Sequence, residues 1–169
     1  RLKKVSYRAE KHNPSYHPGR CAELSVDGVD VGVMGQVHPL VAKNYGIDSD
    51  VYCAEINFTK LMEYLLPDPT YTPLPKYPAV TRDLALICDE AVTVAQAEDV
   101  ITAAAGKLLQ GVKLFDIYRG VGVPEGKKSM AFSLELRADD RTLTDTDSEA
   151  VVTKVLASLK ETLNATLRG

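Results

Sequence analysis

A proline-rich stretch near the middle of the chain separates two parts with different patterns. Residues 67–78, PDPTYTPLPKYP, contain five of the nine prolines in the sequence. Each proline fixes φ, removes a backbone donor and biases the preceding residue toward extended conformations. Such a stretch forms a semi-rigid linker. The sequence therefore predicts one part over 1–66, a linker over 67–78 and a second part over 79–169.

The composition is that of a globular protein, with 45% hydrophobic and 25% charged residues among 169. No apolar run approaches the roughly 18 residues that cross a bilayer, and no signal peptide is visible. Three scattered cysteines (Cys21, Cys53 and Cys88) argue against a disulfide framework and indicate a reducing compartment, so we expect a cytoplasmic protein. Because the chain begins with Arg1, we expect it to be a piece of a longer protein.

The charge of the chain excludes bulk attraction to nucleic acid. The net charge is −3, and neither side of Pro75 carries an excess of basic residues. A polycationic domain would have a basic stripe or patch. We therefore expect no DNA partner and no membrane partner, and any contact with RNA needs local patches.

The first part is predicted to be rich in β-sheet. Strands over 21–26 and 29–37 are joined by Asp27-Gly28, a strong hairpin signal. A short helix over 39–45 is closed by Gly46, a strand follows over 51–58, and Thr59 could cap a helix over 60–66.

The second part has a clearer pattern. Strands are predicted over 82–88, 111–120, 129–137 and 165–168. One helix follows a capping box from Thr93 to Gln96, and another begins after Thr144 or Thr146. The order βαββαβ predicts an α+β, ferredoxin-like domain in which both helices pack on one face of an antiparallel sheet.

The other face of that sheet is where we look for function. Strand alternation predicts that Asp116 and Tyr118 point to this face and that Phe115 and Phe132 point to the core. The same rule places five further residues on this face: Asp83, Ala85, Ser133, Glu135 and Arg137. RNA-recognition sheets stack bases on exposed aromatic side chains. Stacking here should be limited, with Tyr118 and Tyr77 as the available rings.

Other site motifs are weak. GVPEGKKS (122–129) lacks the spacing of a phosphate-binding loop and joins two strands. A basic loop that touches a polyanion and a solvated turn both stay open for it. His17, Cys21 and His38 could suggest a metal, but Pro18-Gly19 prevents a helix from joining 17 to 21. We expect a structural use for these side chains. No catalytic arrangement and no metal site is predicted.

Five segments of the second part, read in order, resemble a known domain. YPAVTRDLALIC, KLFDIYRG, GKKSMAFSLELR, RTLTDTD and ATLRG resemble the C-terminal ferredoxin-fold anticodon-binding domain of bacterial phenylalanyl-tRNA synthetase β subunits, over residues 74–169. In the first part, YHPGRCAEL, GVMGQVHP and YCAEINFTKL are similar to the end of the catalytic-like module of the same subunit.

The resemblance implies recognition of the anticodon of the tRNA for phenylalanine, far from the chemistry. It places aminoacylation on an α subunit of an α2β2 enzyme that uses ATP and Mg, with no cofactor in this chain. Unpaired bases can be stacked and read on their edges, and phosphates need cations. The matching residues are Arg82, Asp83, Asp116, Tyr118, Arg119, Lys127, Lys128, Ser129 and Arg137, with Lys76 and Tyr77 on the linker.

Two other functions stay open at this point. The second part could be a ferredoxin-like regulatory domain that binds a small molecule, since this fold has many uses. The chain could also be a structural interaction domain, with the strands of residues 1–66 docking on a partner.

Overall fold

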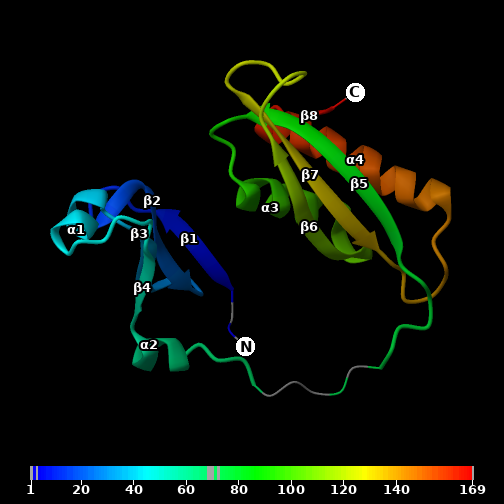
Figure 1. Ribbon diagram of the computed structural model, residues 1–169. Helices are drawn as coiled ribbons and strands as arrows, with labels where there is room; N and C mark the ends of the chain where they lie inside the picture. Colours follow the sequence, from blue (N-terminus) through cyan, green and yellow to red (C-terminus); the bar gives the residue numbers. More distant parts are fainter. Residues whose placement is uncertain (1, 3, 68–70, 72, 169) are drawn as a thin grey trace. The chain divides into compact units, whose positions relative to one another are not determined.

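Figure 1 shows the computed structural model, which describes residues 2, 4–67, 71 and 73–168. The chain divides into two compact units, Arg1–Tyr71 and Thr72–Gly169. Residues 68–70 and 72 of the predicted linker lie outside the described residues. The linker over 67–78 stays a prediction.

The first unit is a four-stranded antiparallel sheet with two short helices. The strands β1 (Val5–Ala9), β2 (Tyr16–Val26), β3 (Val29–Val37) and β4 (Tyr52–Ile56) lie in sequence order, and the helices are α1 (Pro39–Asn44) and α2 (Phe58–Met62). The hairpin at Asp27-Gly28 is confirmed, since both residues have positive φ, 53° and 81°. Paired left-handed residues give the turn whose twist matches the strands.

Two features of this unit differ from the sequence prediction. The sequence analysis did not include β1, although its Val5, Tyr7 and Ala9 alternate with polar residues; all five of its residues are exposed. The cap of α2 is Asn57, whose side-chain oxygen accepts a hydrogen bond from the Lys60 backbone N–H at 3.0 Å. The prediction that Thr59 caps this helix is wrong, because an asparagine two residues earlier is an equally strong N-cap.

The second unit has the predicted βαββαβ order. Its elements are β5 (Val80–Asp89), α3 (Val94–Ala105), the short 3₁₀ helix η1 (Gly106–Leu108), β6 (Leu109–Tyr118), β7 (Lys127–Leu136), α4 (Asp145–Leu163) and β8 (Thr166–Leu167). The sheet order is β6-β7-β5-β8, and every pair is antiparallel. The predicted ferredoxin-like fold is confirmed.

The core of the second unit lies between the sheet and its two helices. Alternate residues of β5 and β7 are buried there: Leu84, Leu86, Cys88, Met130, Phe132, Leu134 and Leu136. From the helices, Ala97 and Ile101 of α3 and Val155 and Leu159 of α4 complete the same cluster. Both helices therefore cover one side of the sheet (Figure 1), and the other side has no helix of this unit on it.

The two helices of this unit begin with reciprocal caps. Thr93 and Gln96 form the predicted capping box at α3. At α4 the cap is Thr144 rather than Thr146, and its partner is Asp147. The Asp147 carboxylate accepts hydrogen bonds from the Thr144 N–H at 2.9 Å and from Arg141 Nη1 at 2.6 Å.

No helix among the described residues combines the length and apolar character needed to span a membrane.

Asp147 should make the second unit less stable in acid. The Arg141 hydrogen bonds, followed by those from Thr144, hold the pKa of Asp147 well below its ordinary value. A carboxyl whose folded-state pKa is depressed stabilises the fold above its unfolded pKa, and this contribution is lost as the pH falls through the folded-state pKa. We expect Asp147→Asn to lower the unfolding free energy near pH 7, with the difference from wild type shrinking below about pH 4. Urea unfolding near pH 7 and below about pH 4 measures the difference in unfolding free energy between the variant and the wild type. A difference that grows in acid would contradict the prediction.

Candidate nucleic-acid interface

The helix-free side of the second sheet carries a row of small and polar side chains. Directly paired residues of neighbouring strands share a face, so the ladders define its members. We call this surface the open face: Thr81, Asp83, Ala85, Ile87 and Asp89 of β5; Lys113, Asp116 and Tyr118 of β6; Lys127, Ser129, Ala131, Ser133 and Glu135 of β7; and Arg137 and Arg168, which follow β7 and β8. The predicted placement of Asp83, Asp116 and Tyr118 on this side is confirmed.

A bulge in β6 changes which aromatic side chain is exposed. Leu114 pairs with the buried Phe132, whereas Asp116 pairs with Ala131 on the open face, so Phe115 is an extra residue between them. Phe115 is 55% exposed and lies outside the core, whereas Phe132 is fully buried. The prediction that Phe115 points to the core is therefore wrong. Strict alternation fails at a bulge, where two residues oppose one on the partner strand.

Most of the predicted cations are already paired with carboxylates. Lys127 Nζ lies 3.0 Å from Asp89 Oδ1 across the β5–β7 ladder, and Arg137 Nη2 lies 3.1 Å from Glu135 Oε1. Arg119, one residue past β6, binds Glu90 through Nε and Nη2, the shortest contact being 2.6 Å. Ion pairs at a protein surface contribute little to stability, but these three cancel most of the positive charge of the surface, and the Arg137 side chain is only 17% exposed.

The Arg119–Glu90 pair also changes the protonation behaviour of both groups. The hydrogen bonds from Arg119 lower the pKa of Glu90, and the same contact raises the pKa of Arg119. The carboxylate therefore stays ionised in mild acid. An incoming phosphate would have to share this guanidinium with Glu90.

Two predicted cations lie on the helix side of the sheet. Arg82 has the same parity as the buried Leu84, and its Nη2 lies 2.6 Å from Asp145 Oδ1 at the start of α4. Lys128 is 7% exposed, and its Nζ donates to the Glu90 carbonyl oxygen at 2.8 Å. The structure thus separates both side chains from the open face. Alternation along a strand already predicts this, since Arg82 cannot share a face with Asp83.

Tyr118 lies beside an arginine that the sequence analysis did not include. The Arg168 guanidinium carbon is 5.1 Å from the centroid of the Tyr118 ring, a cation–π contact. A hydrogen bond of 2.8 Å from the Arg168 N–H to the Ala85 oxygen holds this residue beside β5. β8 and β6 lie at opposite edges of the sheet, so the contact is made by the two long side chains and not by neighbouring strands. Tyr118 itself is 38% exposed.

The remaining predicted residues differ in accessibility. Asp83 and Asp116 are exposed, and neither has an ion-pair partner among the described residues. Ser129 is buried between Ile87 and Tyr118 in the ladder. Lys76 is exposed and Tyr77 is half-buried, in the segment that leads into β5. The sequence analysis also missed Lys113, which the bulge returns to the open face.

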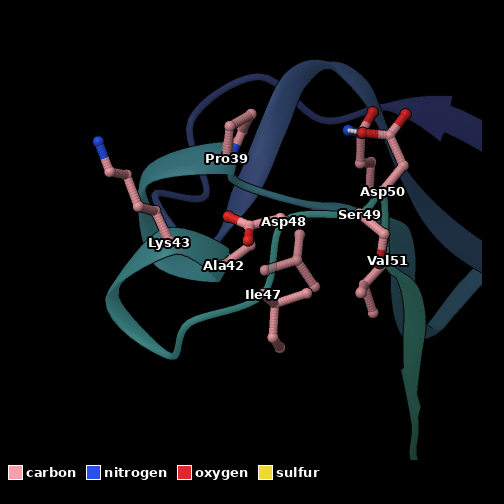
Figure 2. A pocket seen from close by; sticks show the side chains of 10 residues that line it. Pro39, Ala42, Lys43, Ile47, Asp48, Ser49, Asp50 and Val51 are labelled. Atoms are coloured by element: carbon pink, nitrogen blue, oxygen red, sulfur yellow. Dashed lines mark hydrogen bonds between the residues drawn. The ribbon is translucent and has the colours of Figure 1, made fainter.

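One pocket of the first unit does not resemble an active site. Figure 2 shows a pocket of about 200 Å³ beside α1, with the Lys43 side chain extending away from Asp50. Its buried Gln36 donates to Asp50 Oδ1 at 2.8 Å and accepts from Arg20 Nη1 at 2.7 Å. These polar groups therefore satisfy one another.

The histidines considered for a metal have local structural contacts. The Nδ1 atoms of His17 and His38 accept hydrogen bonds from the N–H groups of Gly19 and Leu40, at 3.0 and 3.2 Å. The second of these caps helix α1. Within the described part of the chain, no group of three or more histidine, cysteine or acidic side chains could hold a metal ion.

Comparison with known families identifies the second unit. Residues 75–168 match the family described as the ferredoxin-fold anticodon binding domain. The chain belongs to this family. Residues 1–58 match the phenylalanyl tRNA synthetase beta chain CLM domain. The ferredoxin-fold anticodon-binding domain is therefore preceded here by part of a second domain type, and the resemblance stated from the sequence is confirmed.

The curated relatives that this chain matches are much longer proteins. The phenylalanine–tRNA ligase beta subunit of Clostridium tetani is 43% identical over 99% of this chain and 21% of its own length. That of Symbiobacterium thermophilum is 47% identical over 93% of this chain and 18% of its own length. That of Bacillus subtilis is 44% identical over 90% and 19%. The chain spans about a fifth of the length of these relatives.

The bulge in β6 can be tested by stability alone. Because Phe115 is exposed, Phe115→Thr should change the unfolding free energy by about 0.5 kcal/mol or less. Phe132→Ala, in the neighbouring strand β7, should cost about 3–5 kcal/mol because it leaves a cavity in the core. Urea titrations monitored by circular dichroism compare the two variants. A large loss of stability in Phe115→Thr would place that ring in the core.

Proposed function

We propose that the open face binds the anticodon loop of the tRNA for phenylalanine. One observation carries the proposal: the family match covers the unit whose sheet leaves one polar, helix-free side accessible. Single-stranded loops are read by stacking on aromatic rings and by hydrogen bonds to base edges. Tyr118 offers the ring, and Asp83 and Asp116 offer the acceptors.

The carboxylates suit the amino groups of purines. Adenine presents an N6 amino donor and guanine an N2 amino donor on their edges. Asp83 on β5 and Asp116 on β6 lie on the two strands that flank β7. Both are exposed, and neither has an ion-pair partner among the described residues. A GAA anticodon has a purine at each position, so each base offers an amino group to such acceptors. Ser129 lies beneath Tyr118 in the ladder and would set the position of the ring.

The cations of the surface would contact phosphates beside the bases. Arg119, Lys127 and Arg137 each have an exposed carboxylate partner, which a phosphate oxygen can join or replace. Lys76 and Tyr77 would add contacts at the entrance to β5. Arg82 and Lys128 would act indirectly, by holding α4 and the Glu90 segment in place. With few free cations, we expect affinity to depend only weakly on salt.

In the whole enzyme this chain would serve ATP-dependent attachment of phenylalanine to tRNA. The names of the curated relatives support a β subunit that works with an α subunit. An α2β2 assembly in the cytoplasm is part of the same proposal. We expect ATP and Mg to be held elsewhere in the enzyme. No residue of this chain is assigned a catalytic role.

The first unit has a feature that favours a docking role. One face of its sheet presents exposed apolar side chains from neighbouring strands, among them Tyr7, Met34, Tyr52 and Ile56. Contiguous apolar surface of this kind marks an interaction site. By contrast, the hollow on the open face beside Thr81 and Gly111 is about 200 Å³, smaller than the usual pocket for a small molecule. No observation favours a small-molecule regulatory role.

A binding titration tests the proposal. The chain should bind a tRNA with a GAA anticodon more tightly than the same tRNA with a scrambled anticodon. Tyr118→Ala should cost about 1–3 kcal/mol toward the GAA form, because a stacked base contributes that much. The exposed aromatic Tyr45 of the first unit offers a matched control, since Tyr45→Ala should bind like wild type. Equal affinity of the wild type for both RNAs would leave only non-specific charge and would refute the proposal.

A further inference from the structure

We propose that Phe115 is a second base-stacking residue, which binds an unpaired nucleobase at the rim of the open face. This inference rests on the proposed RNA-binding function and extends it to a residue that the resemblance did not assign. The bulge of β6, the exposure of the ring and the contact between Arg168 and Tyr118 carry the argument.

The two bulges of β6 provide an internal comparison. The register shifts once between Leu109 and Gly111 and again between Leu114 and Asp116, which leaves Gln110 and Phe115 as the extra residues. Both are exposed on an edge strand. Gln110 is the polar residue expected there, and its side chain contacts the Arg137 carbonyl oxygen. A bulge can protect an edge strand from pairing with another chain. That role does not explain why the second bulge of β6 carries an exposed phenylalanine.

The surroundings of Phe115 suit a nucleotide. Asp116, the neighbouring acceptor, lies between Phe115 and Tyr118 along the strand, while Ile117 pairs with Met130 on the core side. The ladder advances by two residues from Ala131 to Ser129, which separates Asp116 from Tyr118 by about 7 Å, and Phe115 is the residue before Asp116. Lys113, two residues earlier, is exposed and has no ion-pair partner within the described part of the chain. It can bind the phosphate of a base that stacks on Phe115.

Tyr118 alone cannot stack two bases while its contact with Arg168 persists. The guanidinium lies 5.1 Å from the ring centroid and occupies one side of the ring, so two bases cannot stack on it at once. A second unpaired base of the loop then needs another ring. On β6 that ring is Phe115, 55% exposed. A loop held by both rings would place the carboxylate of Asp116 between two bases.

The experiment uses the full chain and an RNA hairpin with the GAA anticodon loop. In three separate hairpins, 2-aminopurine replaces one anticodon base, so that stacking on a ring quenches its fluorescence. We expect Phe115→Ala to weaken binding about 5- to 50-fold and to restore fluorescence at one position. Tyr118→Ala should restore it at a different position. Phe115→Tyr should keep affinity and quenching, and Phe115→Leu, apolar but without a π-face, should keep neither in full.

The outcomes separate this inference from the proposed function. If the wild type prefers the GAA loop and Tyr118→Ala weakens binding, but Phe115→Ala binds and quenches like wild type, the inference about Phe115 is overturned alone. If the wild type does not discriminate between loops, the proposed function fails and the inference fails with it. Thermal unfolding shows whether Phe115→Ala is folded, and Tyr45→Ala serves as the exposed aromatic control from the first unit.

Discussion

The packing of two helices against a single side of one sheet is the interaction on which the second unit depends. Every second residue of β5 and β7 is buried against α3 and α4, with Phe132, Leu134 and Leu86 fully enclosed. Because side chains alternate along a strand, the residues between them must point the other way. That side is built from small and polar groups that need no cover. The surface proposed for RNA is thus a direct consequence of where the core lies.

The charges on this surface favour selectivity over general attraction. Carboxylates accompany the cations at each end of the sheet, as Asp89 does for Lys127 at one end and Glu135 for Arg137 at the other. A surface of this kind attracts polyanions weakly, in keeping with the net charge of −3. Recognition must then come from ring stacking and from acceptors placed for base edges. A tRNA-binding surface that contributes little non-specific affinity would let the rest of a large enzyme determine where the tRNA docks.

The sequence predicts the elements of the second unit because local signals and periodicity agree there. The alternation of SMAFSLELR predicts a strand, and the capping box that begins at Thr93 predicts the start of a helix. The structure has both. The site is less predictable, because a bulge changes the face of every residue beyond it. Phe115 and Lys113 were therefore assigned to the wrong side or omitted. Arg168 could not be found either, since it follows the strand at the opposite edge of the sheet and no local pattern links its side chain to Tyr118.

Mapping the contact surface by NMR tests the central claim most directly. The chain of 169 residues is small enough for amide chemical shifts to be followed during titration with a GAA anticodon hairpin. The account predicts that the largest shifts fall on alternate residues of β5 and β7 that face away from the helices, such as Asp83 and Ala131, and on 115–118 of β6. Shifts concentrated on the exposed faces of α3 and α4, with the sheet unchanged, would contradict it.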